Sequence, residues 1–483
     1  MDKDLISIQE ARDMADKAYQ AQLVWAKASQ QQVDLVCSAM AETAFSASER
    51  LGQMAHEETG YGVPAHKKLK NEFASQFLWH SIQHIRTVGL INHDLQKQIM
   101  EIAWPVGVIA ALTPSTNPTS TVMAKTLSAV KARDAIVIAP HPSAIRCSYE
   151  TTRIMQEAAE KAGAPAGLVN CMENISLNGT QELMAHKRVR LILATGGSGM
   201  VKAAHSVGKP AYGVGPGNVP AYVDRSADIE KAATYIVASK AFDYSTICAT
   251  EQAVVADKPI AHQLKQQMQS QGAYFADENT TAILRKLLFY EDGGMNTSTV
   301  GKSAQVLAQL GGLSIPSGTK IIVVPLQHTG EQEPLSREKL TTVIGWYEEE
   351  GWEAGCERCI DLIHFGGRGH TLVIHATDEN VILAFGLEKP VFRILVNTMG
   401  TLGAVGLTTG LMPSMTLGAG GEGGSITGDN ITVQHLFNIK RLAYETMPPP
   451  AMLFDAASGA SGPAQINVEM LVRRVIEEIV QNS

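Results

Sequence analysis

Short apolar runs alternate with helical stretches over residues 102–224, and this alternation constrains the fold more than any other feature of the chain. The runs are IAWPVGVIAALTP (102–114), DAIVIAPHP (134–142), GLVNCME (167–173), VRLILATGG (189–197) and VPAYVD (219–224). The intervening stretches 118–132 and 145–164 have helical spacing. The pattern predicts an α/β fold with a mainly parallel sheet covered by helices on both faces. Because ligands of such sheets bind beyond the carboxyl ends of the strands, we expect the loops TPSTNP (113–118), APHPSA (139–144) and ATGGSG (194–199) to gather.

The rest of the composition narrows the class of protein. Residues 8–27 and 30–45 predict long amphipathic helices, and a chain of 483 residues predicts two domains. The net charge of -8 gives no basic face for nucleic acid. The N-terminus lacks a signal-peptide pattern, and no apolar run approaches the ~20 residues of a membrane span. Six cysteines form no disulfide framework. We therefore expect a soluble protein of the reducing cytoplasm.

Two glycine clusters are candidates for close approach to a ligand. Gly196, Gly197, Ser198 and Gly199 lie between a predicted strand and a helix, where backbone N–H groups face an anion. Lys202 occupies the last glycine's place of a G-x-G-x-x-G motif, so an ordinary strand–helix turn is an equal interpretation. The cluster YGVGPGNVP (212–220) is equally consistent with a ligand contact or a tight turn.

Two further patterns favour structural roles. Cys356 and Cys359 form C-x-x-C without a second pair, and the surrounding pattern is that of a helix interior, so we interpret them as partly buried thiols. His364, His370 and His375 have no carboxylate or cysteine at matching spacing, so structural histidines are favoured and no metal site is predicted.

The motifs become informative as an ordered set. TPSTNP, APHP, ATGG, GVGPGN, C-x-x-E-Q around Cys248, GKS and GRGHT follow one another along residues 5–445. This set resembles the CoA-acylating branch of the aldehyde dehydrogenase superfamily, including acetaldehyde, succinate-semialdehyde and sulfoacetaldehyde dehydrogenases. It also resembles the aldehyde half of the bifunctional aldehyde–alcohol dehydrogenases, of which only the aldehyde step is expected here.

The resemblance implies a catalytic pair and a missing base. Cys248 is expected to attack the aldehyde as a thiolate, and Asn117 with the Cys248 backbone N–H to bind the oxyanion. Gly213 stands where hydrolytic relatives carry the glutamate that activates water, so the acyl group is expected to pass to coenzyme A. Glu251 is interpreted as structural support.

The resemblance also implies the cofactor residues. NAD is favoured over NADP, and Arg146 is a candidate for binding a 2′-phosphate. The residues expected to contact the cofactor are Leu112, Thr113, Pro114, Ser115, Thr116, His141, Pro142, Ser143, Gly197, Gly215 and Glu338.

The implied architecture is the aldehyde dehydrogenase fold, a Rossmann-like cofactor domain plus an α/β catalytic domain with β-ribbon oligomerisation segments. The expected cofactor domain is 1–220, with a ribbon near 92–104, and the catalytic thiol domain is 221–430. Residues 431–447 are the expected C-terminal oligomerisation segment of a homodimer or tetramer.

Two alternatives stay open for the activity: a reductase of acyl phosphates that uses the same cysteine, and a non-catalytic relative. A short aldehyde of two to four carbons is expected, but its identity is open. Arg393 and Arg368 are candidates for binding an anionic tail or for structural ion pairs, at even odds.

The C-terminal tail has a pattern of its own. Residues 448–465 have the composition of a flexible linker, and residues 466–483 place apolar side chains at helical spacing. A helix this short is stable only if its apolar face is buried against another surface. It resembles the encapsulation peptides that direct enzymes into bacterial microcompartments, an interpretation favoured over a helix docked on its own subunit or a coiled-coil contact.

Overall fold

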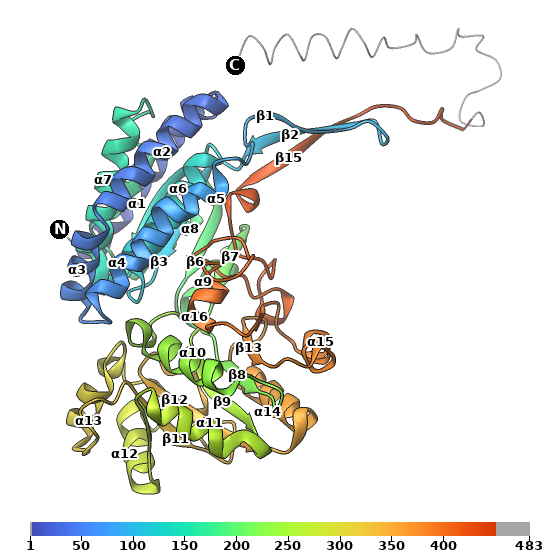
Figure 1. The fold of residues 1–483 in the computed structure, drawn as a ribbon. Coiled ribbons are helices and arrows are strands. Elements are labelled where there is room, and N and C mark those ends of the chain that lie inside the picture. Colours follow the sequence, from blue (N-terminus) through green and yellow to red (C-terminus); the bar gives the residue numbers. More distant parts are fainter. Residues whose placement is uncertain (1, 451–483) are drawn as a thin grey trace, which may run out of the picture.

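The computed structural model describes residues 2–450 and contains two parallel sheets and a small antiparallel one (Figure 1). The predicted helix 466–483, with most of the linker 448–465, lies outside the described residues. The mixed α/β architecture agrees with the prediction from the alternating pattern.

The first parallel sheet has five strands in the order β5-β4-β3-β6-β7. Its strands are β3 (Val108–Thr113), β4 (Ala135–Pro140), β5 (Val169–Cys171), β6 (Val189–Thr195) and β7 (Ala211–Val214). Strands β3 and β4 are buried at every residue, as expected for a sheet covered on both faces. The predicted strand 102–114 is divided, since Ile99–Pro105 forms β2 of another sheet.

Helices of the N-terminal half cover this sheet (Figure 1). They are α1 (Lys3–Trp25), α2 (Gln30–Ser46), α3 (Ser48–Thr59), α4 (Pro64–Glu72), α5 (Leu78–Ile82), α6 (Pro118–Lys131), α7 (Ile145–Lys161), α8 (Leu177–Ala185) and α9 (Ser198–Ser206). Ser29 and Gln32 form a capping box that starts α2. The π-helical turn Phe73–Phe77 follows α4. Val405, Met415 and Ile431 also pack into this core, so the C-terminal segment returns to the first sheet.

The second parallel sheet has seven strands in the order β10-β11-β12-β9-β8-β13-β14. Its strands are β8 (Val219–Val223), β9 (Glu251–Asp257), β10 (Ala273–Phe275), β11 (Ile321–Pro325), β12 (Val343–Glu349), β13 (Leu372–His375) and β14 (Ile394–Val396). The associated helices are α10 (Ile229–Ala241), α11 (Lys258–Ser270), α12 (Glu278–Leu288), α13 (Ala304–Gly311), α14 (Gly351–Phe365), α15 (Glu379–Glu388) and α16 (Gly400–Ala404). Strands β8 and β9 are buried throughout.

The antiparallel sheet β1-β2-β15 extends away from the body of the molecule (Figure 1). It consists of β1 (Gly89–Asp94), β2 (Ile99–Pro105) and β15 (Phe437–Ala443), so the segments near 92–104 and 431–447 do pair with each other. The exposed side chains of Trp104, Ile439 and Leu442 lie on these strands. Within residues 2–450, no helix is both long and apolar enough to cross a membrane.

Candidate active site

A cavity of about 470 Å³ lies where loops of the two parallel sheets meet. Its walls come from the ends of β3, β4, β6 and β7, from the turn before β9, and from residues 338–340. The three loops predicted to gather all contribute to it, as parallel topology requires. The predicted site residues that line it are Pro114, Ser115, Thr116, Asn117, His141, Ser143, Gly197, Gly215, Cys248 and Glu338.

Three predicted cofactor residues do not line the cavity. Leu112 and Thr113 are the last residues of β3, and both are buried in the sheet. Pro142 is the first residue of the short 3-10 turn Pro142–Ala144, between His141 and Ser143. Because a β-strand directs its side chains into the layers on either side, the residues beyond the strand end are the ones that face the cavity.

Cys248 follows a turn of unusual backbone conformation. Asp243, Tyr244 and Ser245 have φ angles of 47°, 50° and 67°, in the left-handed region that non-glycine residues seldom adopt. Such a run persists only where the surroundings fix it. A Cβ at Gly217 would lie 2.3 Å from the Cys248 carbonyl oxygen, so only glycine lets the 212–220 loop approach the nucleophile.

The Cys248 thiol contacts His370, the histidine of the GRGHT motif, for which the sequence predicted only a structural role. His370 Nε2 lies 3.2 Å from Cys248 Sγ, and His370 Nδ1 lies 2.9 Å from Thr371 Oγ1. Burial lowers the pKa of His370 to about 3, with a further lowering from Arg393, so the imidazole is neutral. The preference for a structural histidine over a metal ligand did not consider this contact, in which the His370 ring nitrogen faces the candidate nucleophile.

Opposing effects act on the thiol. Burial, and then the Glu338 carboxyl, raise the pKa of Cys248 to about 12, although Arg393 and the backbone N–H groups of Cys248 and Ala249 lower it. The resting thiol is therefore protonated and needs a base. His370 is the base within hydrogen-bond distance.

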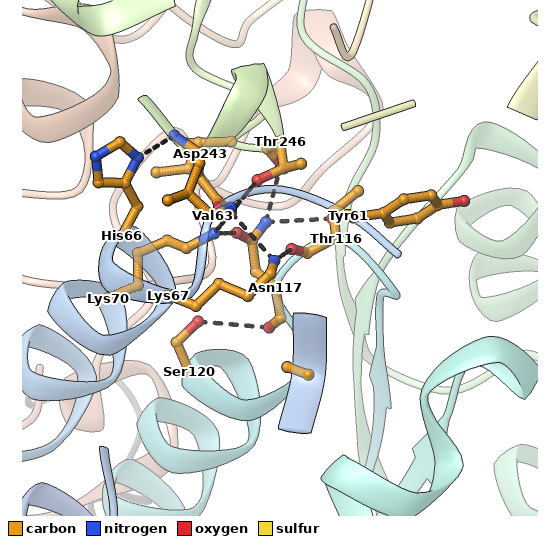
Figure 2. Close-up of polar contacts among 12 residues, drawn as sticks. Tyr61, Val63, His66, Lys67, Lys70, Thr116, Asn117, Ser120, Asp243 and Thr246 are labelled. Atoms are coloured by element: carbon orange, nitrogen blue, oxygen red, sulfur yellow. Dashed lines mark hydrogen bonds and ion pairs between the residues drawn. The ribbon is translucent and has the colours of Figure 1, made fainter. Parts of the chain in front are cut away.

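Asn117 lies beside the turn, as Figure 2 shows. Its Nδ2 donates to the Thr246 carbonyl oxygen at 3.0 Å and to Thr116 Oγ1 at 3.2 Å. Its Oδ1 accepts from Lys70 Nζ at 2.6 Å. Since Thr246 is two residues before Cys248, the amide N–H groups face the segment that carries the nucleophile.

Glu338 and two glycines fit a dinucleotide. Glu338 Oε1 accepts from the Gly217 N–H at 3.0 Å, and burial raises the Glu338 pKa to about 7. A Cβ at Gly197 or Gly215 would meet no atom within 4 Å, so these backbones face open space in the cavity wall. The Glu338 carboxylate and the open backbone at Gly197 and Gly215 leave room for the expected cofactor, whose contacts stay a prediction.

The position expected to hold the hydrolytic carboxylate is closed to any side chain. A Cβ at Gly213 would lie 2.4 Å from His205 Nε2 and 2.6 Å from Val201 Cγ1. Both atoms belong to α9, which packs over β7. Helix α9 therefore excludes a glutamate from this position unless His205 and Val201 move.

Arg393 and Arg368, the two candidates for binding an anionic substrate, lie outside the cavity lining. Arg393 is buried and donates to Asn430 Oδ1 at 2.7 Å, and to the carbonyl oxygens of His370, Gly418 and Gly428. Arg368 is half exposed and lies 4.0 Å from Glu422. Neither side chain lines the cavity.

Other predictions can be compared with the geometry. Glu251 is buried, and accepts from Ser239 Oγ at 2.5 Å and from the Gly400 N–H at 2.7 Å, which confirms its structural role. Cys356 and Cys359 are buried within α14, as predicted for thiols of a helix interior. Across residues 2–450, no cluster of three or more His, Cys, Asp or Glu side chains has the geometry of a metal site.

The chain belongs to the aldehyde dehydrogenase family, whose sequence profile matches residues 4–275. It is 40% identical over 424 residues to aldehyde-alcohol dehydrogenase 2 of Entamoeba histolytica, covering 86% of this chain and 49% of that protein. The chain thus spans about half the length of the aldehyde-alcohol dehydrogenases it matches. It is 36% identical to the acetylating succinate-semialdehyde dehydrogenase of Clostridium kluyveri, covering 90% of this chain and 95% of that protein.

Solved structures give the same assignment. An acetylating aldehyde dehydrogenase from Geobacillus thermoglucosidasius has a TM-score of 0.92 and 48% identity, covering 93% of this chain and 99% of that one. A Rhodopseudomonas palustris propionaldehyde dehydrogenase with bound CoA and an acylated cysteine has a TM-score of 0.81, 27% identity, and coverage of 90% and 97%. A propionaldehyde dehydrogenase from the Clostridium phytofermentans fucose utilisation bacterial microcompartment has a TM-score of 0.81 and 28% identity. The match covers 89% of this chain and 96% of that one.

Proposed function

We propose that the protein converts a short-chain aldehyde, NAD(P)⁺ and CoA to an acyl-CoA and NAD(P)H, reversibly. The observation that carries the proposal is the 3.2 Å contact between His370 Nε2 and Cys248 Sγ, beside Asn117. A nucleophile, its base and an amide donor around one cavity are the minimum set for covalent aldehyde chemistry.

Each residue of the site has a separate role in the proposed reaction. Cys248 Sγ attacks the aldehyde carbonyl, and the thiol proton moves to the His370 ring, whose pKa is raised by the negative charge that forms beside it. The oxyanion of the thiohemiacetal forms next to the Asn117 amide and the Cys248 backbone N–H, which stabilise the developing charge. NAD(P)⁺, held by the loops with Gly197, Gly215 and Glu338, supplies a hydride acceptor when bound. Cys248 then carries the acyl group as a thioester.

The thioester is expected to transfer to a thiol rather than to water. Gly213 supplies no carboxylate, and its Cβ position is closed by His205. Water is a weak nucleophile without a base, whereas a thiol is intrinsically strong and titrates near neutral pH. After His370 has released the Cys248 proton to solvent, it can receive the proton of the CoA thiol and return it to the departing Cys248 sulfur. The CoA-bound propionaldehyde dehydrogenase supports this assignment.

The cavity composition favours an uncharged aldehyde. Ile247, Met295, Val300, Leu340 and Leu417 supply apolar surface, and neither lysine nor arginine is among the cavity-lining residues within 2–450. An anionic aldehyde or an acyl phosphate would enter without a cation to pair with its charge, which is costly. We therefore place acetaldehyde and propionaldehyde ahead of succinic semialdehyde and sulfoacetaldehyde, and aldehyde oxidation ahead of acyl-phosphate reduction.

A glutamate far away in the sequence supports NAD over NADP. Both carboxylate oxygens of Glu58 accept backbone N–H groups at the start of α7, from Arg146 at 2.8 Å and Cys147 at 2.7 Å. This places negative charge beside Arg146, close to the loop of His141 and Ser143. A 2′-phosphate near this loop would be repelled by that charge.

The projecting antiparallel sheet supports an oligomer. Exposed Trp104, Ile439 and Leu442 lie on it, and a cavity of about 880 Å³ opens between the sheet and the α1–α2 connection. Pairing through the sheet would cover these apolar groups, in a dimer or a dimer of dimers. Light scattering at micromolar concentration tests this, and a monomer would contradict it.

The tail sequence supports delivery into a bacterial microcompartment. Val468, Leu471, Val472, Val475 and Ile476 recur at helical spacing in residues 466–483. A similar structure is named as a microcompartment enzyme. A fluorescent protein fused to residues 451–483 should collect in compartment shells. Diffuse fluorescence, with unchanged packaging of a chain truncated after Pro450, would contradict this.

The activity is tested by following NADH formation from acetaldehyde with and without CoA. We expect NADH formation to depend on CoA and the product to be acetyl-CoA by mass spectrometry. CoA-independent NADH formation with acetate as the product would reject the acylating assignment. Equal turnover of succinic semialdehyde would reject the preference for uncharged aldehydes.

A further inference from the structure

Three charged side chains are buried together directly behind Asn117 (Figure 2). Asp243 is fully buried, and the side chains of Lys67 and Lys70 are 2% and 5% exposed. Lys67 Nζ lies 3.2 Å from Asp243 Oδ2, and Lys70 Nζ pairs with the same oxygen. Burial would raise the pKa of Asp243, but the two lysines lower it to about 2, so the carboxylate is ionised.

The carboxylate fixes the turn that leads to the nucleophile. Asp243 Oδ1 accepts the Val63 N–H at 2.7 Å, and Asp243 Oδ2 accepts the Thr246 hydroxyl at 2.5 Å. A Cβ at Gly62 would lie 2.0 Å from Asp243 Oδ1, so the chain before α4 closes tightly over the carboxylate. These contacts support the left-handed conformations of residues 243–245.

The two lysines differ in one contact. Lys67 donates its further hydrogen bond to the Thr116 carbonyl oxygen at 3.2 Å. Lys70 donates to Asn117 Oδ1 at 2.6 Å and to Thr246 Oγ1 at 3.3 Å. An ammonium group has three donors and no acceptor, so it can face only the oxygen of an amide. Lys70 thereby turns the NH₂ group of Asn117 toward Thr246 and the nucleophile segment.

We propose that Lys70, held by Asp243, is a positioning residue that fixes the amide orientation of Asn117 for oxyanion binding. Asn117 is the N-cap residue of α6, but its side chain makes no capping hydrogen bond. Besides Lys70, only the Thr246 carbonyl oxygen and Thr116 Oγ1 orient its amide among residues 2–450, and both accept from Nδ2. Without Lys70, the amide could turn its oxygen toward the developing negative charge, and repulsion would replace a hydrogen bond. This inference rests on the proposed role of Asn117 in the aldehyde reaction.

The test compares Lys70→Met with Lys67→Met, since both remove one cation from Asp243 but only the first releases Asn117. Burial lowers the pKa of Lys70 to about 7, so assays run at slightly acidic pH, where the ammonium form dominates. Measurements are kcat and KM for CoA-dependent aldehyde oxidation, and the rate of Cys248 alkylation by iodoacetamide. Asn117→Ala and the double variant Lys70→Met/Asn117→Ala complete a double-mutant cycle, which measures the coupling between Lys70 and Asn117.

Loss of one oxyanion donor lowers kcat by ~10²–10³-fold, so we expect this for Asn117→Ala and about the same for Lys70→Met. The double variant should match Asn117→Ala, because Lys70 acts through that amide. Alkylation of Cys248 should change little in any variant, and Lys67→Met should keep most of its turnover.

Three results would overturn the proposal: near-normal kcat in Lys70→Met, losses that multiply in the double variant, or an equal loss in Lys67→Met. If Lys70→Met fails to fold, Lys70→Met/Asp243→Asn is compared with Asp243→Asn by the same criteria. An inactive wild-type enzyme would reject the proposed function, whereas full activity in Asn117→Ala would reject the role of Asn117. Either result differs from the one that would reject only the role of Lys70, which is an active wild-type enzyme, an impaired Asn117→Ala and a near-normal Lys70→Met.

Discussion

The turn that carries Cys248 and the helix that carries Cys356 and Cys359 place thiols in opposite settings. Burial raises the pKa in both places, so burial alone does not distinguish them. In α14 the backbone N–H groups belong to the helical hydrogen-bond ladder. In the turn, the N–H groups of Cys248 and Ala249 interact with the sulfur, and His370 stands 3.2 Å away.

The comparison shows that irregular backbone supplies free N–H groups, which the interior of a regular helix cannot. A residue outside a ladder has an N–H group free to stabilise charge on its own side chain or on a bound oxyanion. The left-handed residues Asp243, Tyr244 and Ser245 create this opening.

Replacement of the turn cysteine should have the largest effect. Cys248→Ser removes the strong nucleophile, and kcat for CoA-dependent aldehyde oxidation should fall by roughly 10⁴-fold or more. Cys356→Ser is the matched control from the helix and should leave kcat nearly unchanged. Comparable losses in the two variants, measured by NADH absorbance, would remove the distinction.

Replacement of the base should come next. His370→Ala removes the group that receives the thiol proton, and kcat should fall by ~10²–10³-fold. His364→Ala, on α14, is the control from the helix side of the comparison. A variant at His370 with normal turnover at neutral pH would show that another group takes the proton.

A methyl group at the closest glycine should cost less. In Gly217→Ala the new Cβ would meet the Cys248 carbonyl oxygen at 2.3 Å, so the nucleophile must move. Displacement of about 1 Å can cost ~10²-fold in rate, and we expect a loss up to this size in kcat/KM. Gly386→Ala, whose Cβ meets no atom within 4 Å, is the control and should be active.

The pH dependence of alkylation should separate Cys248 from an unperturbed thiol. With a pKa of about 12 the thiolate fraction is small at neutral pH and grows as pH rises. The iodoacetamide rate at the Cys248 peptide should therefore increase ~10-fold per pH unit through neutral and mildly alkaline pH. A plateau near the ordinary cysteine pKa, seen by mass spectrometry, would show that the pKa of Cys248 is not raised.

The smallest expected effect is on stability alone. Cys359 is fully buried in α14, and Cys359→Ala should lower the free energy of unfolding by ~1–2 kcal/mol while kcat stays the same. Thermal unfolding and turnover of one preparation measure both. A loss of activity without a loss of stability would assign α14 a part in the chemistry.

Local pattern was sufficient for much of the fold and for part of the site. The alternation of 102–224 predicted β3, β4, β5 and β6 of the first sheet, because periodicity reflects burial within one element. It did not predict β7, and the predicted strand 219–224 is β8 of the second sheet. Asn117 and Cys248 were predicted from the motif set that resembles the aldehyde dehydrogenase family. The convergence of loops at one edge of a parallel sheet explains why Asn117 reaches the same cavity.

The remaining site residues depend on tertiary packing. His370 is 122 positions from Cys248, and Lys70 is 173 from Asp243. The residues next to His370 in the sequence do not predict that its ring faces a thiol. With His364 and His375 nearby, it was interpreted as a structural histidine. Lys67 and Lys70 look like surface lysines of an amphipathic helix until the helix meets a buried carboxylate. Such pairs follow from the docking of elements, which periodicity does not encode.

The crowded space at Gly213 has an evolutionary consequence. A mutation that restored the hydrolytic glutamate would first bring its Cβ against His205 and Val201. Both are side chains of α9, so they would have to shift or be replaced before the glutamate fitted. Under the proposed function, a hydrolytic descendant would need a change on α9 as well as the glutamate, and the present site would keep the energy of aldehyde oxidation in the acyl-thiol product.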